Sequence, residues 1–153
     1  LNFAPEALVE TDIRLHQVAN DADWAAKRAL HGASGTGPDG HENAPGLWVD
    51  LEQRKSQSGG LELYLVMRNE DVIGALGLMA QNSILRLKNL VMHPDYRGSG
   101  LGAEAVRAGC AEAARRGYAT VGVFALEQHG TLAFYESCGF QPVTTQTEWT
   151  MGA

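Results

Sequence analysis

The chain has 153 residues, 44% of them hydrophobic, which is enough for one domain with its own core. A net charge of −6 argues against a protein that binds nucleic-acid phosphates and leans towards a cationic or amine-bearing partner. No apolar run is long enough for a transmembrane helix, and no signal peptide is recognisable. The two cysteines are too few for a disulfide framework, so we expect reduced thiols in a cytoplasmic protein.

The predicted elements begin with a strand at 12–18, where apolar and polar residues alternate, and a helix at 22–31. Residues 32–46 hold five glycines and two prolines, which predicts a loop. The remaining pattern predicts helices at 47–57, 99–116 and 131–137, and strands at 61–68, 72–80, 83–92, 118–126, 140–144 and 147–151. The order βααβββαβαβ(β) predicts a single α/β domain of the α+β type with a mixed sheet over residues 1–153. The chain starts with Leu, which leaves open that it is a piece of a longer protein.

A glycine-rich turn between a predicted strand and helix is the clearest chemical signal. Glycines at 98, 100 and 102 let the backbone approach an anion, and the helix start and Arg97 add N–H donors and positive charge. The Lys-Ser/Thr of a P-loop is missing. A dinucleotide-binding fingerprint is a second interpretation, because Gly98, Gly100 and Ala103 fit its spacing. Five residues separate the strand from the glycines, however, and only 26 residues follow Glu127, the candidate ribose ligand.

Two motifs resemble those of the GNAT superfamily of acyl-CoA-dependent N-acetyltransferases. The sequence LVMHPDYRGSGLG at 90–102 is similar to the family's strand, glycine turn and helix start. The sequence TLAFYESCGF at 131–140 is similar to its second motif, and the predicted element order matches along nearly the whole chain. The resemblance implies a three-layer domain whose central, mixed, splayed sheet is flanked by helices. It also implies acetyl-CoA as co-substrate and no metal.

The resemblance also implies roles for single residues. The backbone of Leu90 and Met92 would bind the pantetheine arm and meet the thioester carbonyl, in the manner of an added strand. The amides of 98–103 would cradle the pyrophosphate, and Tyr135 would lie near the sulfur and protonate the leaving thiolate. The expected cofactor-binding residues are Leu90, Val91, Met92, Arg97, Gly98, Ser99, Gly100, Leu101, Gly102, Ala103 and Gln128.

A general base is not evident from the sequence. Some relatives carry a Glu four residues before the Leu90 position, where this chain has Arg86. The remaining base candidates are Glu127, His129, His31, His41 and Glu42. We expect the loop 32–46, Trp48 and Trp149 to frame the acceptor site.

These observations predict an enzyme that moves an acetyl group from acetyl-CoA to a primary amine of a small molecule by direct attack on the thioester. Two alternatives stay open: an acyl-CoA-binding regulatory module without catalysis, and a protein or peptide N-acetyltransferase. We expect a small-molecule amine as partner and neither nucleic acid nor membrane, and we leave a homodimer open.

Overall fold

The computed structural model describes residues 2–3, 12–34, 45–125 and 130–147. Its six described strands form one sheet in the order β1-β6-β5-β4-β3-β2. The strands are β1 (Asn2–Phe3), β2 (Ile13–Gln17), β3 (Leu61–Arg68), β4 (Asp71–Gln81), β5 (Ile84–Met92) and β6 (Thr120–Val123). The helices are α1 (Asp21–Ser34), α2 (Pro45–Gln57), the 3-10 helix η1 (Pro94–Tyr96), α3 (Leu101–Arg115) and α4 (Thr131–Ser137). The sheet is mixed, because β5 and β6 run parallel and the other described pairs run antiparallel.

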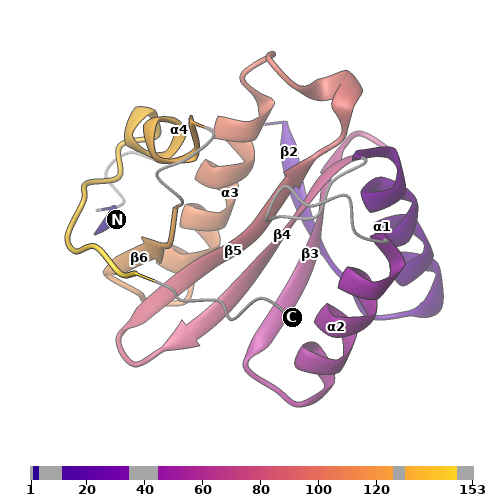
Figure 1. The fold of residues 1–153 in the computed structure, drawn as a ribbon, viewed down its shortest axis with the longest axis horizontal. Helices are drawn as coiled ribbons and strands as arrows, with labels where there is room; N and C mark the ends of the chain where they lie inside the picture. The colour runs from indigo at the N-terminus through magenta and orange to yellow at the C-terminus, as the bar shows by residue number, and fades with distance from the viewer. Residues whose placement is uncertain (1, 4–11, 35–44, 126–129, 148–153) are drawn as a thin grey trace.

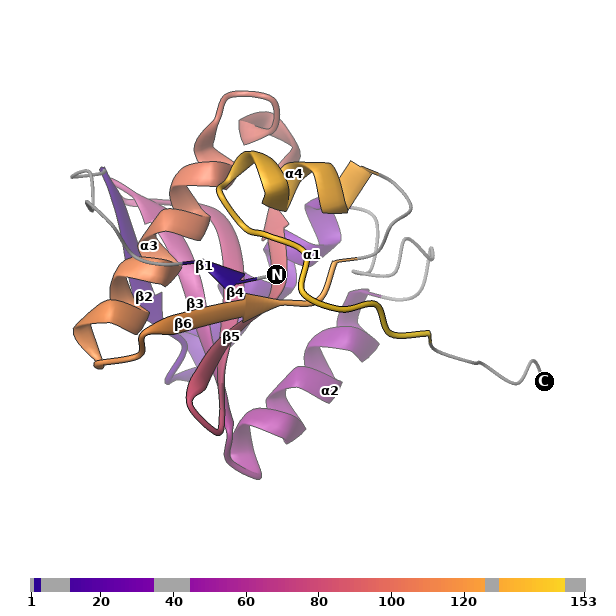
Figure 2. The same cartoon turned by 90° about the vertical axis from the view of Figure 1, so that its left-hand side faces the viewer.

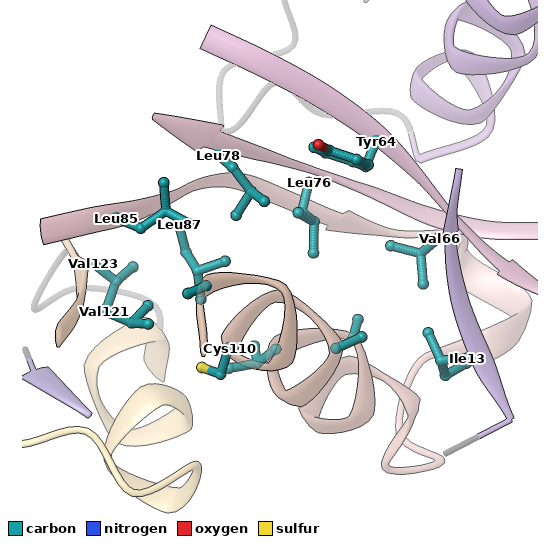
Figure 3. Close-up of a cluster of buried hydrophobic side chains, with 14 of the residues drawn as sticks. Ile13, Tyr64, Val66, Leu76, Leu78, Leu85, Leu87, Cys110, Val121 and Val123 are labelled. Carbon is teal, nitrogen blue, oxygen red and sulfur yellow. The ribbon is translucent and has the colours of Figure 1, made fainter. Parts of the chain in front are cut away.

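Helices cover both faces of the sheet, which gives three layers (Figures 1 and 2). On one face, Leu85 and Leu87 of β5 and Leu76 of β4 pack with Cys110 of α3 in the larger core cluster (Figure 3). On the other face, α1 packs Trp24 against a smaller cluster on β3. The predicted three-layer α/β fold with a mixed sheet is therefore confirmed.

Strand β5 contains a bulge near its carboxyl end. Its pairing with β4 shifts register between Ala75 and Gly77. Asn89 adopts a left-handed backbone conformation (φ 54°) at this point, which Asn tolerates better than most residues. A bulge re-aims the backbone that follows it, so Asn89 sets the direction in which Leu90 presents its main-chain groups.

The sheet splays beside the same bulge. Strand β5 pairs with β6 only where Ile84–Leu87 faces Thr120–Val123. From residue 88 to residue 92, this edge of β5 has no partner strand among the described residues. The splayed sheet implied by the resemblance is therefore present, and it leaves main-chain donors and acceptors open for another extended chain.

The predicted elements agree with the structure from α1 to α4, apart from their ends. The strand predicted at 118–126 is shorter, because the splay ends its pairing at Val123. The strand predicted at 140–144 is wrong: Phe140 is buried, but 141–147 is exposed and forms one isolated bridge. Residue 147 is not in a strand, and the rest of the strand predicted at 147–151 lies outside the described residues. The short β1 was not predicted.

None of the described helices combines the length and the apolar character that crossing a bilayer requires.

Candidate active site

A cavity of about 670 Å³ lies where β5, the glycine turn and the start of α3 meet α4. Its wall brings together eight of the expected cofactor-binding residues from β5, the glycine turn and the start of α3. They are Leu90, Val91, Met92, Arg97, Gly98, Gly100, Gly102 and Ala103. The other lining residues are His31, Tyr96, Phe134 and Ser137. Of these four, only His31 was expected from the sequence. Phe134 and Ser137 belong to the second motif, where Phe134 directly precedes Tyr135 and Ser137 follows it by two residues.

The glycine turn makes one end of the cavity. Gly98 and Gly100 have φ of 71° and 82°, a region that favours glycine, and a Cβ built on either would meet no heavy atom within 4 Å. Gly100 caps the 15-residue α3 and makes no side-chain capping hydrogen bond. The first amides of a helix have no partner within it and carry a partial positive charge. This end of the cavity is therefore suited to an anion such as a phosphate.

The free edge of β5 makes the neighbouring wall. Leu90, Val91 and Met92 line the cavity in the part of β5 that β6 does not cover. On the other side of the strand, Gly74 of β4 approaches closely, because a Cβ there would lie 2.6 Å from the Val91 carbonyl oxygen. The absence of a side chain at Gly74 thus lets β4 support the bulged backbone from behind.

Three of the cofactor-binding residues expected at the glycine turn make side-chain contacts within the protein. The Arg97 Nε donates to the Met92 carbonyl oxygen at 3.1 Å, so this side chain bridges the two cavity walls. The Ser99 hydroxyl donates to the Tyr96 carbonyl oxygen at 2.7 Å and is not on the wall. Leu101 is buried in the core. Side-chain roles at Ser99 and Leu101 are thus structural in this turn, and only their backbone amides remain as donors.

Tyr135 lies behind the cavity wall. The residue is 6% exposed, and its ring makes edge contacts with Phe134 and Phe140, at centroid distances of 5.1 and 5.7 Å. It is not among the lining residues, whereas Phe134 is. Burial, together with the neighbouring Cys138 thiol, raises the pKa of Tyr135 to about 12. The phenol is therefore protonated at neutral pH, as a proton donor must be, and its catalytic role stays a prediction.

Three ionisable side chains from α1 and α2 are buried together beside the cavity. The Lys27 Nζ lies 2.8 Å from Glu52 Oε2 and 3.0 Å from His31 Nε2. None of the three residues is more than 1% exposed. Burial lowers the pKa of Lys27, while burial and then the Lys27 charge lower the pKa of His31 to about 4. His31 is therefore neutral at pH 7. It is the one base candidate that the described part of the chain places on the cavity wall.

Glu52 also connects this cluster to the bulge in β5. The Asn89 amide nitrogen donates to Glu52 Oε1 at 2.9 Å. The second oxygen, Oε2, faces Lys27 as an ion pair and accepts no directed hydrogen bond from the described residues. Glu52 thus ties α1, through Lys27, to the residue that sets the direction of the β5 backbone.

The structure describes Arg86 and Trp48, but several other residues expected at the site lie outside its described ranges. Arg86 is half-buried on β5, and no described acidic side chain replaces the Glu that some relatives carry there. Trp48 is half-buried on α2. The expected cofactor ligand Gln128, four base candidates, Trp149 and residues 35–44 of the loop lie outside the described residues. The four base candidates are Glu127, His129, His41 and Glu42. Within the described ranges, no three His, Cys, Asp or Glu side chains are grouped to hold a metal ion.

Comparison with known proteins identifies the fold and its family. The sequence model of the Acetyltransferase (GNAT) family matches residues 24–140. The comparison with curated proteins found no match. The fold is similar to that of an acetyltransferase from Trypanosoma brucei, with 20% identity, a TM-score of 0.65, and coverage of 91% of this chain and 99% of that one.

Two further solved structures resemble the chain. One is AAC(6')-Iy in complex with the bisubstrate analogue CoA-S-monomethyl-acetylneamine, with 13% identity, a TM-score of 0.64, and coverage of 92% of this chain and 99% of that one. The other is the ribosomal-protein-S18-alanine N-acetyltransferase from Escherichia coli, with 19% identity, a TM-score of 0.62, and coverage of 86% and 79%. At these identities the likeness establishes the shared fold.

Proposed function

Because the chain belongs to the GNAT acetyltransferase family, we propose that it transfers an acetyl group from acetyl-CoA to a primary amine of a small molecule. The observation that carries this proposal is the joining of the glycine turn and the free edge of β5 in one cavity. A cofactor with a pyrophosphate at one end and an extended, amide-bearing arm at the other needs both features side by side.

The residues present fit acetyl-CoA. The open amides at Gly98, Gly100 and the start of α3 would hold the pyrophosphate, with Arg97 beside them. The main chain of Leu90–Met92 would pair with the pantetheine arm as an added strand. An N–H on this stretch would also stabilise the oxyanion that forms on the thioester carbonyl. The similar AAC(6')-Iy structure contains a CoA-based analogue, which supports a CoA ligand in this fold.

The reaction requires two proton transfers. A primary ammonium group must lose a proton before its nitrogen can attack, and the leaving thiolate must gain one. We assign the second step to Tyr135, supported by its position in the second motif and by the pKa that keeps the phenol protonated. We assign no general base, because the His31 Nε2 is already in contact with Lys27.

The direct experiment measures cofactor binding and turnover separately. Acetyl-CoA should raise the melting temperature of the protein, and NADH should not. A panel of amines with acetyl-CoA should then release free thiol with at least one acceptor. Stabilisation by NADH alone would contradict the proposal. In Tyr135→Phe, lost turnover with retained acetyl-CoA binding supports the proton-donor role, and unchanged turnover removes it.

Two alternatives use the same cavity. An acyl-CoA-binding module without catalysis is favoured by the described cavity wall, which holds no carboxylate, and it would bind acetyl-CoA without releasing thiol with any amine. A protein or peptide acceptor is suggested by the name of the similar E. coli enzyme, and peptides with a free amino terminus in the panel would test it. The proposal includes one catalytic domain over residues 1–153, a cytoplasmic location, and neither nucleic acid nor membrane as partner.

A further inference from the structure

Two cations occupy the face of β5 that looks away from α3. Arg86 and Lys88 are alternate residues of one strand and therefore share a face, while Leu85 and Leu87 point into the core under α3. Both cations are half-buried. Gly122 opposite Arg86 on β6 and Gly77 opposite Lys88 on β4 add no side chain of their own, whereas Met79 of β4 also pairs with Arg86, and Leu61 and Leu63 of β3 lie beside Gly77. The two cations thus lie beside each other on one face of β5, next to apolar side chains of β3 and β4.

Helix α2 lies on the same side of the sheet as this face of β5, because its Glu52 accepts a hydrogen bond from Asn89. Trp48, Glu52 and Lys55 follow each other at helical spacing, and the bond from Asn89 to Glu52 shows that this stripe faces β5. Lys55 is close enough to contribute to the lowered pKa of Lys88, after burial and the charge of Arg86. The Trp48 Nε1 is a buried donor without an acceptor among the described residues.

Among the described residues, these cations have no acidic side chain in ion-pair contact. Within the described ranges, no carboxylate oxygen lies within 4.0 Å of the charged nitrogens of Arg86, Lys88 or Lys55. Arg86 donates to the neutral amide of Gln81 at 3.2 Å and stacks 4.1 Å from the ring centroid of Phe124. Glu52 acts on Lys88 from a distance, but its carboxylate is already held by Lys27 and Asn89. Lys55 is exposed, but Arg86 and Lys88 are half-buried cations without a contacting anion among the described residues, which is unfavourable, so a bound anion would stabilise this face.

The position of the cations relates them to the proposed reaction. Lys88 and Arg86 precede Leu90 by two and four residues, which is about 7 and 13 Å along a strand. Phe124, which stacks on Arg86, directly follows β6 where the sheet splays. An acceptor whose amine reaches the free edge of β5 would therefore extend over Arg86 and Lys88 if it lies along the strand.

We propose that Arg86 and Lys88 bind a carboxylate or phosphate group on the amine acceptor, a substrate class that rests on the proposed acetyl transfer. Arg binds both groups through its planar fork, and a charge-assisted bond is stronger than a neutral one. The net charge of −6 leans towards a cationic acceptor, whereas these local charges select an amine that also carries an anion.

The test compares acceptors that carry the anion with matched acceptors that lack it. The pairs are glucosamine with glucosamine 6-phosphate, and L-phenylalanine with L-phenylalaninamide, with spermidine as the cationic acceptor. Thiol release should show kcat/KM about tenfold or more higher for the anionic member of one pair. The responding pair tells phosphate from carboxylate. Equal or better rates with the neutral members or spermidine would overturn the inference and leave acetyl transfer standing.

Variants connect this preference to the two side chains. Arg86→Gln and Lys88→Gln should each raise KM for the anionic acceptor about tenfold and leave the neutral member unchanged. Lys88→Arg should retain the preference. Arg68→Gln removes the same charge from the exposed end of β3 and should change nothing. A preference that survives in the double variant Arg86→Gln/Lys88→Gln would refute the assignment.

A binding measurement separates the inference from the proposed function. If acetyl-CoA binds but no acceptor releases thiol, acetyl transfer is contradicted. Calorimetric titration of both acceptor pairs into the CoA complex then decides the inference alone. Tighter binding of an anionic member that is lost in the double variant supports it, and equal binding of both members refutes it.

Discussion

The buried pair of Lys27 and Glu52 gives the sharpest quantitative prediction. Their charged atoms lie 2.8 Å apart, and both residues are at most 1% exposed. At an effective dielectric constant of about 20, this distance corresponds to about 6 kcal/mol of attraction, which the cost of removing both groups from water largely offsets. Lys27→Met keeps the desolvated carboxylate and removes its counter-charge. We expect the free energy of unfolding to fall by about 3–5 kcal/mol.

Removing both charges should reverse most of this loss. In Lys27→Met/Glu52→Leu no charge of the pair remains buried, and replacing a buried ion pair by apolar side chains is often neutral or stabilising. The Asn89 amide then loses its acceptor, at about 1–3 kcal/mol if water does not replace it. We expect the double variant to be more stable than Lys27→Met alone, which is a strongly non-additive result.

Urea denaturation of the wild type, Lys27→Met, Glu52→Leu and the double variant completes this double-mutant cycle. Equal losses in Lys27→Met and in the double variant would refute the predicted non-additivity, and a loss below about 1 kcal/mol in both would show that water screens the pair. Glu52→Gln provides a functional comparison, because its amide oxygen still accepts from Asn89. It should bind acetyl-CoA better than Glu52→Leu, which releases the bulge.

Three other predictions follow from single residues. Because the pKa of His31 falls from 6.5 to about 4 on folding, the unfolded chain binds more protons between these pH values, so stability should decrease by about 3 kcal/mol from pH 7 to pH 4 in denaturation curves. His31→Gln should remove most of that slope, and an unchanged slope would contradict it. Gly74→Ala should destabilise the protein by about 1–3 kcal/mol and weaken calorimetrically measured acetyl-CoA binding, since its Cβ would meet the Val91 carbonyl oxygen at 2.6 Å. Gly109→Ala is the control, because its Cβ meets the end of a leucine side chain and should leave that binding intact. Cys110, whose pKa is raised to about 12 by burial, should not react with a thiol reagent at pH 8 unless the protein unfolds.

The sequence predicted the fold where periodicity and turn residues agree. Leu61–Arg68 and Thr131–Ser137 were predicted to the residue, because polar or glycine residues mark both of their ends. The strand predicted at 140–144 failed, because a buried Phe140 followed by Gln and Pro resembles a strand start locally. A strand also needs a neighbouring strand to pair with, and the local sequence does not show whether the fold places one there.

The candidate site was predicted in part for the same reason. The glycine turn and Leu90–Met92 carry local motifs, and the structure brings them to one cavity. The cluster of Lys27, His31 and Glu52 has no such signal, because its members come from two helices and only the packing of α1 on α2 makes them neighbours. The i to i+4 spacing of Lys27 and His31 was visible, but charged helix residues at that spacing are usually exposed.

Binding of acetyl-CoA to the cavity is the central claim, and calorimetric titration measures it most directly. Wild-type protein should bind one acetyl-CoA per chain. Ala103→Trp, which places a large ring on the cavity wall, should abolish binding, whereas Arg107→Trp on the exposed side of the same helix should retain it. Failure of the wild type to bind acetyl-CoA, or equal binding by Ala103→Trp, would contradict the account.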